Sequence, residues 1–196
     1  MMKVQDGRRR RGAALEEAIL DAAWAELAES GYAALTLENV ARRAGTSRPV
    51  LHRRWAGRLA LATAALARQF ARDTIVIPDL GSLREELSLL LRFMSNRSRG
   101  DGLQLVFDMQ RDLAAERSSF ADLHACIVDG HQFRAVLARA VERGEIDPTR
   151  LTPRIAALPL DLVRHELLMT FAPLSVAAIR EIVEDIFLPL VSPRPG

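Results

Sequence analysis

Apolar side chains recur every three or four residues along most of this chain, and no stretch alternates between apolar and polar residues as a strand does. The pattern therefore predicts an all-α protein. A first helix is marked by apolar positions on one face, namely Leu15, Ile19, Ala22, Ala23 and Leu27. Gly31 follows them and is expected to end this helix in a left-handed conformation, which glycine adopts at little cost.

A short second helix is predicted next. Thr36 can cap its N-terminus, and Leu35 and Val40 flank that cap at the spacing of a hydrophobic staple. The helix is expected to stop at Ala44 and Gly45, because glycine can take the positive φ of a tight turn.

A third helix follows this turn. Thr46 or Ser47 can cap it, and Pro49 falls in its first turn, where proline is tolerated. It is expected to run through Trp55 until Gly57 breaks it. Two short helices joined by a glycine turn indicate a helix-turn-helix, whose second helix enters the major groove of DNA.

The rest of the chain predicts further helices. A fourth is expected over residues 58–72, and the absence of proline between Pro78 and Pro148 leaves room for long helices after it. The expected later spans are 82–98, 102–115, 118–144, 152–171 and 175–190. We predict a three-helix DNA-binding domain with a basic arm at residues 1–60, and a helical regulatory and dimerisation domain at residues 61–196.

Charge divides the chain in the same way. Residues 1–60 hold eleven Lys and Arg against seven acidic residues, whereas the remainder holds sixteen basic and eighteen acidic residues. A basic first segment indicates a polyanionic partner for that segment alone. The run from Arg8 to Arg11 is an expected arm that adds attraction to phosphates or enters a minor groove.

Several classes of protein are not expected. Cys126 is the only cysteine, so no internal disulfide is predicted. The longest uncharged run, residues 167–179, is too short to span a bilayer, and no secretory signal is recognisable. No phosphate loop or activated nucleophile is present, so we expect a cytoplasmic protein that is not an enzyme, has no cofactor and has no membrane partner.

The chemistry of the exposed side chains suggests separate roles at DNA. Arg48 suits a bidentate contact to guanine, Pro49 suits a thymine methyl group, and His52 suits a phosphate or a base edge. Residues at the helix starts and flanks suit phosphates, with Arg58 as a clamp. The predicted DNA-binding residues are Thr36, Thr46, Ser47, Arg48, Pro49, His52, Arg53 and Arg58.

These residues carry a resemblance to the TetR family of bacterial transcriptional regulators. The stretch ILDAAWAELAESGYAALTLENVARRAGTSRPVLHRRW, followed by Arg58 and Leu61, is similar to the N-terminal domain of that family over about residues 14–66. The resemblance implies a homodimeric repressor that a small-molecule effector releases from a near-palindromic operator in double-stranded DNA.

This sequence departs from the family pattern at two positions. His52 stands where the family usually has a tyrosine, which leaves open whether this position contacts a base or a phosphate. Arg58 stands where the family usually has a lysine, so the charge is kept and the geometry is changed.

A ligand-responsive protein needs an apolar pocket with a few polar groups. The predicted pocket residues are Phe93, Met94, Phe107, Cys126, Ile127, His131, His165 and Met169, although ordinary core packing explains any single one of them more simply. His124, Cys126 and His131 suggest a metal site at first sight, but their spacing does not bring them to one helix face, and no metal is predicted.

One short helix contacts few base pairs, so a dimer is also expected on physical grounds. The apolar face of 175–190, together with the helix 152–171, is the predicted interface; packing within one chain is the alternative for both. Two other functions compete with the regulator: a DNA-organising protein without a ligand response, and a helical enzyme, which needs a titratable cluster that the sequence lacks.

Overall fold

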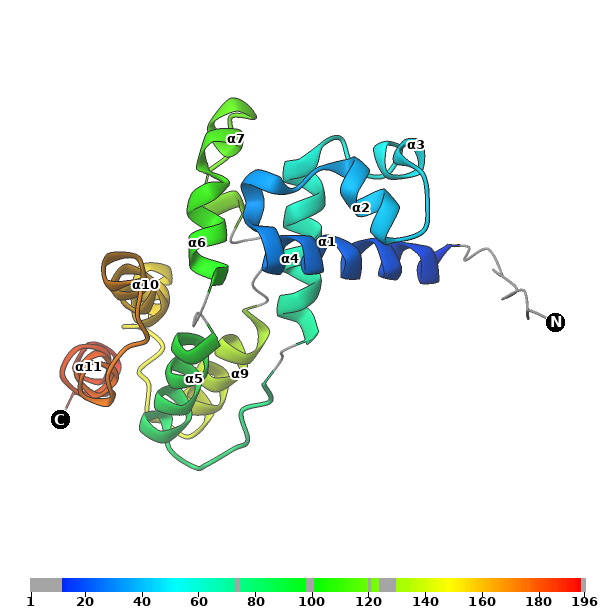
Figure 1. Ribbon diagram of the computed structural model, residues 1–196. Helices are drawn as coiled ribbons and strands as arrows, with labels where there is room; N and C mark the ends of the chain where they lie inside the picture. Colours follow the sequence, from blue (N-terminus) through cyan, green and yellow to red (C-terminus); the bar gives the residue numbers. More distant parts are fainter. Residues whose placement is uncertain (1–11, 73–74, 98–100, 120, 124–129, 195–196) are drawn as a thin grey trace. The chain divides into compact units, whose positions relative to one another are not determined.

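The computed structural model describes residues 12–72, 75–97, 101–119, 121–123 and 130–194, and every element in these ranges is helical (Figure 1). The all-α expectation is therefore confirmed. Contacts divide the chain into two compact units. Unit 1 comprises Met1–Arg72 and Leu105–Val128, and unit 2 comprises Asp73–Gln104 and Asp129–Gly196.

Unit 1 is built around the first four helices, which we call the head. They are α1 (Ala13–Ala34), α2 (Leu37–Arg43), α3 (Arg48–His52) and α4 (Arg58–Arg72). Figure 1 shows α1 crossing α4, while α2 packs against both α1 and α3. Leu105 of α6 (Asp101–Asp108), Met109 between the helices and Leu113 of α7 (Gln110–Ala115) join the same apolar core.

The start of α2 follows the predicted capping pattern. The Thr36 hydroxyl accepts a hydrogen bond from the Asn39 amide at 3.1 Å, and the flanking Leu35 and Val40 are fully buried. Gly31 interrupts the last turn of α1 with φ 74° and ψ 174°. Gly31 was predicted to end the helix in a left-handed conformation; the helical backbone is interrupted there, but α1 continues to Ala34 and the ψ of Gly31 lies outside the left-handed helical region.

The turn between α2 and α3 closes with two backbone hydrogen bonds. The Thr46 amide donates to the Ala41 carbonyl at 2.9 Å and the Gly45 amide donates to the Arg42 carbonyl at 3.2 Å, which is the Schellman pattern of a helix end. Gly45 sits at the left-handed position of this motif with φ 66°. The angle between the two helices therefore depends on a conformation that other residues rarely adopt.

Replacing Gly45 by alanine is expected to destabilise the head by about 1–2 kcal/mol, because a Cβ is strained at positive φ even though no atom lies within 4 Å of it. Denaturant unfolding measures the change. Gly57→Ala is the matched control, since its Cβ also meets no atom and its φ is not in the positive range. Equal unfolding midpoints for the two variants would show that the turn carries no such strain.

The third helix is shorter than predicted. It ends at His52, whereas a continuation through Trp55 was expected. The Leu51 carbonyl accepts hydrogen bonds from both the Arg54 and Trp55 amides at 2.9 Å, so the backbone after His52 forms a tighter turn. The Trp55 ring that follows is buried in the core. The expected single helix over 102–115 is also interrupted, at Met109 between α6 and α7.

The fourth helix agrees with the predicted span of 58–72 and packs with the helices before it. The predicted boundary between a DNA-binding domain (1–60) and a regulatory domain (61–196) remains a prediction. The compact units do not follow a single cut in the chain.

Unit 2 contains the remaining helices. They are α5 (Leu83–Arg97), α9 (His131–Glu142), α10 (Pro153–Thr170), α11 (Val176–Arg180), the π-helix η1 (Glu181–Phe187) and α12 (Leu188–Val191). Of these, α5 contacts α9, α10, α11 and η1. Thr152 caps α10 and Ser175 caps α11 through their hydroxyls, so the last helices begin close to where the sequence predicts.

A buried carboxylate anchors the segment before α5. Glu86 is fully buried, and its oxygens accept from Arg139 Nη2 at 2.6 Å and lie 3.0 Å from Arg143 Nη1. The Leu80 amide also donates to Glu86 at 3.2 Å. Because a buried charge is tolerated only when it is paired and hydrogen-bonded, this cluster ties α5, α9 and the preceding loop into one body.

Candidate DNA-binding surface

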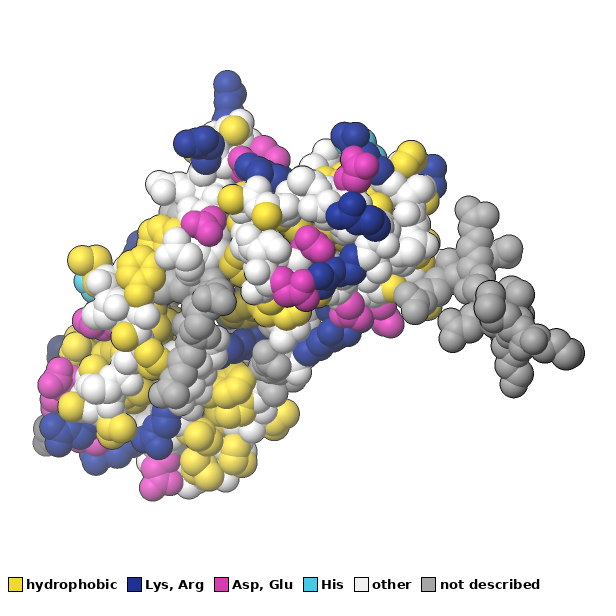
Figure 2. Space-filling view, viewed as in Figure 1, with side chains coloured by type: hydrophobic (Ala, Val, Ile, Leu, Met, Phe, Trp, Pro, Cys, Tyr) yellow, Lys and Arg dark blue, Asp and Glu magenta, His cyan; other side chains and the backbone are white. Residues whose placement is uncertain are grey.

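The outward side of α3 forms an open hollow. Its lining consists of Arg48, Pro49, His52 and Arg53, while Leu51 between them is buried in the core of the head. Figure 2 shows basic side chains on the part of the surface where α3 lies, with acidic side chains beside them. The four predicted reading-helix residues therefore lie together on one exposed face.

A second hollow adjoins the first through Arg48, which lines both. Its other lining residues are Leu35, Thr36, Leu37, Glu38, Asn39, Arg42 and Arg58. Thr36 and Arg58 are thus brought to the same concave surface as Arg48, as their predicted roles require. Arg42 was not predicted; it is exposed on α2, and its outward helix position was the available signal.

The arginines of the head differ in whether an acidic side chain neutralises them. Arg43 pairs with Glu26 at 2.9 Å and with Glu29, and Arg54 pairs with Glu16 at 2.7 Å. Arg72 pairs with Asp21 at 2.7 Å. These charges are balanced within the head and offer little to a polyanion.

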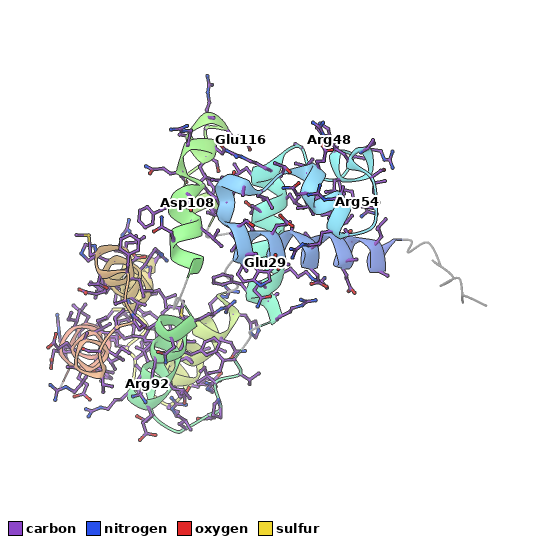
Figure 3. The ribbon with its side chains drawn as sticks, in the orientation of Figure 1. Glu29, Arg48, Arg54, Arg92, Asp108 and Glu116 are labelled. Carbon is purple, nitrogen blue, oxygen red and sulfur yellow. The ribbon has the colours of Figure 1, made fainter. Side chains whose placement is uncertain are left out.

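Arg48 and Arg53 have a different environment. Within the part of the chain that the structure describes, neither makes an ion pair, and both are exposed at α3. Figure 3 shows Arg48 on the outward side of the helix pair and Arg54 nearer to α1. Within the described part of the head, exposed arginines without an ion pair therefore lie on α3 and, with Arg42, in the hollow beside it.

The two predicted capping residues of α3 are placed differently. Ser47 occupies the N-cap position and is exposed, and its hydroxyl makes no capping hydrogen bond. Thr46 is half-buried, and its amide is used in closing the turn. Neither lines the two hollows, so their predicted contacts with phosphate stay predictions.

Arg58 has a partner that the sequence did not suggest. Its Nε donates to Asp112 Oδ2 at 2.6 Å and its Nη2 to Oδ1 at 3.1 Å, while the Tyr32 hydroxyl donates to the same Oδ2 at 2.6 Å. The guanidinium carbon lies 4.8 Å from the centroid of the Tyr32 ring, within range of a cation–π contact. Asp112 comes from α7, 54 residues further along the chain, so no local pattern could reveal this cluster.

The charges within this cluster shift one another. The hydrogen bonds from Arg58 and then Tyr32 lower the pKa of Asp112 to about 2. Burial, followed by the neighbouring Asp112 carboxylate, raises the pKa of the Tyr32 phenol. The pKa of Arg58 is raised by its hydrogen bond to Asp112, so the guanidinium and the carboxylate stay ionised together near neutral pH.

The Arg58–Asp112 pair makes the stability of unit 1 depend on pH. Since the pKa of Asp112 falls from 3.8 to about 2 on folding, the stabilisation is complete above pH 3.8 and is lost as the pH falls toward about 2. After allowing for partial exposure, we expect Asp112→Asn to cost about 1–2 kcal/mol at neutral pH. Unfolding measured at neutral pH and near pH 2 tests this. A cost that stays the same at both values contradicts it.

The predicted pocket residues do not form one described cluster. Phe93 and Met94 are half-buried on α5, and Phe107 is half-buried on α6. His131 begins α9 and is exposed, while His165 and Met169 are exposed one turn apart on α10. Cys126 and Ile127 lie outside the described residues. The pocket therefore remains a prediction. Its two proposed members on α10, His165 and Met169, are exposed to solvent.

Among the described residues, no group of three or more His, Cys, Asp or Glu side chains is arranged to hold a metal ion. His124 and Cys126 of the dismissed metal cluster fall outside the described ranges. None of the described helices has both the length and the apolar character needed to span a bilayer.

Both parts of the chain match family models. Residues 19–65 match the model for bacterial regulatory proteins of the tetR family. Residues 77–186 match the model for the tetracyclin repressor-like C-terminal domain, which alone covers more than half of the chain. The first match contains α2, α3 and the turn between them.

Individual relatives agree with these matches. A DNA-binding transcriptional repressor TetR from Mycobacteroides abscessus is 28% identical over 188 residues, which cover 95% of this chain and 97% of that protein. The HTH-type transcriptional regulator YdeS from Bacillus subtilis is 25% identical over 178 residues, or 87% of each chain. The crystal structure of the TetR family transcription regulator SCO0332 matches with a TM-score of 0.69 at 26% identity, covering 91% of this chain and 99% of that one. The chain therefore belongs to the TetR family and is a DNA-binding, repressor-like transcriptional regulator rather than an enzyme.

Proposed function

We propose that this regulator is a homodimeric repressor that binds a near-palindromic operator through two copies of α3 and leaves it when a small-molecule effector binds. The observation that carries the DNA-binding step is the separation of charges in the head. Among the described residues, Arg48 and Arg53 have no acidic partner and are exposed on α3, whereas Arg43 and Arg54 are neutralised elsewhere on the head. Because bacterial DNA lies in the cytoplasm, we propose that the protein acts there.

Within this surface the residues divide by the part of DNA that each suits. Arg48 lines both hollows and has the donor geometry for guanine, while Pro49 and His52 lie beside it at the same face. Thr36 at the start of α2 and Arg42 in its last turn both line the adjoining hollow, and a hydroxyl, helix-start amides and a guanidinium suit a phosphate. Contacts of the first kind select a sequence and contacts of the second kind position the head.

Dimerisation through the last helices is supported by where unit 2 exposes large apolar side chains. All such side chains in the described residues, apart from Val76 and Leu80, lie between residues 169 and 190. They are Met169, Phe171, Val176, Ile186 and Leu190. Apolar side chains gathered on neighbouring helices are typical of an interface between subunits. The predicted interface of 152–171 and 175–190 includes all of them.

An effector is proposed on the basis of the family. A solved structure with this fold, described as the flavonoid-responsive regulator FrrA, matches with a TM-score of 0.59 at 23% identity, covering 94% of this chain and 100% of that one. That fold is therefore compatible with a response to small molecules. In this chain the half-buried Phe93 and Met94 on α5 are the first positions to examine.

Selection of bound sites from randomised duplex DNA tests the repressor proposal. The expected outcome is an enriched sequence with two inverted half-sites, spaced by one helical turn or more. Repeating the selection with a library of small molecules identifies the effector by loss of the enriched site. Equal binding to enriched and scrambled duplexes at physiological salt would instead indicate a DNA-organising protein.

A further inference from the structure

Arg58 lies between two possible partners. It lines the hollow shared by Thr36, Arg42 and Arg48, where a DNA phosphate is expected, and it is held by Asp112 from α7. The carboxylate takes the Nε and Nη2 donors, which together form one of the forks that arginine uses for a phosphate. A guanidinium cannot offer the same fork to both groups at once.

The charge of Arg58 is also cancelled in this arrangement. A DNA phosphate that enters the hollow meets a neutral Arg58–Asp112 pair instead of a free cation. Its binding is therefore less favourable, and fewer counterions are released from the DNA. The Tyr32 ring beneath the guanidinium does not depend on the carboxylate, since it contacts Arg58 through its π face. Without the negative charge of Asp112, Arg58 keeps its contact with the Tyr32 ring, and its Nε and Nη2 donors become free to bind a phosphate.

We propose that Asp112 restrains DNA binding by competing with DNA phosphate for Arg58. Asp112 acts through Arg58 and does not itself touch DNA. Any event that draws Asp112 away from Arg58 raises the affinity of the head for DNA of every sequence. The inference rests on the predicted contact between Arg58 and a phosphate, and the test below can fail without affecting the proposed repressor function.

The test is a double-mutant cycle in the full-length protein with Asp112→Asn and Arg58→Gln. The amide that Asp112→Asn introduces has the size of the carboxylate and can still accept from the Tyr32 hydroxyl, but it carries no charge. Binding to one labelled duplex of mixed sequence is measured from about 50 to about 200 mM salt. Asp112→Asn is expected to raise affinity about twofold to fivefold at the low-salt end, in line with the release of one partly exposed ion pair. The salt slope should steepen by about 0.9 for each Arg58 that reaches a phosphate.

Glu116→Gln is the matched control, because it removes the same charge from the end of α7, four residues after Asp112 (Figure 3). It is expected to leave affinity and salt slope close to those of the wild type. In the Arg58→Gln background, Asp112→Asn should give no gain. If Asp112→Asn still raises affinity in the Arg58→Gln background, or if Glu116→Gln raises affinity equally, the effect is one of net charge. Either result would contradict the proposed competition for Arg58. So would unchanged affinity in a folded Asp112→Asn protein, as judged by circular dichroism.

Discussion

Replacing Arg48 by alanine is expected to remove most of the preference for the operator while leaving the protein folded and dimeric. Arg48 is exposed, makes no ion pair within the described residues and lies at the junction of the two hollows. A bidentate contact from arginine to guanine is worth about 1–3 kcal/mol of discrimination. A dimer makes the contact in both half-sites, so the operator should lose about 2–6 kcal/mol relative to scrambled DNA.

Arg54→Ala provides the control for charge. It removes the same positive charge six residues further along, from a side chain that pairs with Glu16. It should change binding to operator and scrambled DNA little and to a similar extent. Competition binding with both duplexes at one salt concentration measures the ratio for each variant. If Arg48→Ala weakens both duplexes equally, Arg48 contacts phosphate and the base contact must come from another residue on α3.

The parts of the fold that the sequence predicts correctly depend on local chemistry. Thr36 caps α2 because a hydroxyl three residues before a free amide reaches it without any tertiary contact. Gly45 ends α2 because positive φ is strained for any residue with a Cβ. The outward residues of α3 follow from helical periodicity, once Leu51 and Trp55 are assigned to the core.

The state of each arginine depends instead on distant residues. Arg54 is neutralised by Glu16, 38 residues before it, and Arg58 by Asp112, 54 residues after it. Both partners are brought near by the packing of α1 and α7 in unit 1, which no local pattern encodes. The helix-turn-helix pattern and the positions of the arginines therefore predicted the DNA-binding segment, but only the structure separates Arg48 and Arg53 from their neutralised neighbours.

The ends of some helices were also beyond local reasoning. No glycine or proline marks the interruption at Met109, and none marks the π-helical segment Glu181–Phe187. Both lie where side chains are buried, so packing decides the backbone there. A wider π-helical turn changes which residues of the last helix share a face, and this bears on the proposed dimer interface.

Placing two aspartates in that interface is expected to give a folded monomer that no longer binds the operator tightly. Ile186 and Leu190 are spaced four residues apart, and 37% and 36% of their respective side chains are exposed in the single chain. Exposure in the monomer allows the double variant Ile186→Asp and Leu190→Asp to fold. Burial against a second subunit would leave each charge unpaired, at a cost of several kcal/mol.

Val76→Asp is the matched control, since Val76 is the most exposed of the large apolar side chains in the described ranges, at 78%, and lies before α5, outside the proposed interface. Sedimentation analysis measures the oligomeric state, and operator binding is measured on the same samples. The loss of affinity for the double variant should reach about 100-fold or more, because the second head no longer benefits from a high effective concentration at its half-site. A double variant that remains dimeric would place the interface elsewhere. A monomer that keeps full affinity would show that one head alone accounts for tight binding, which would contradict the proposal of an operator with two half-sites.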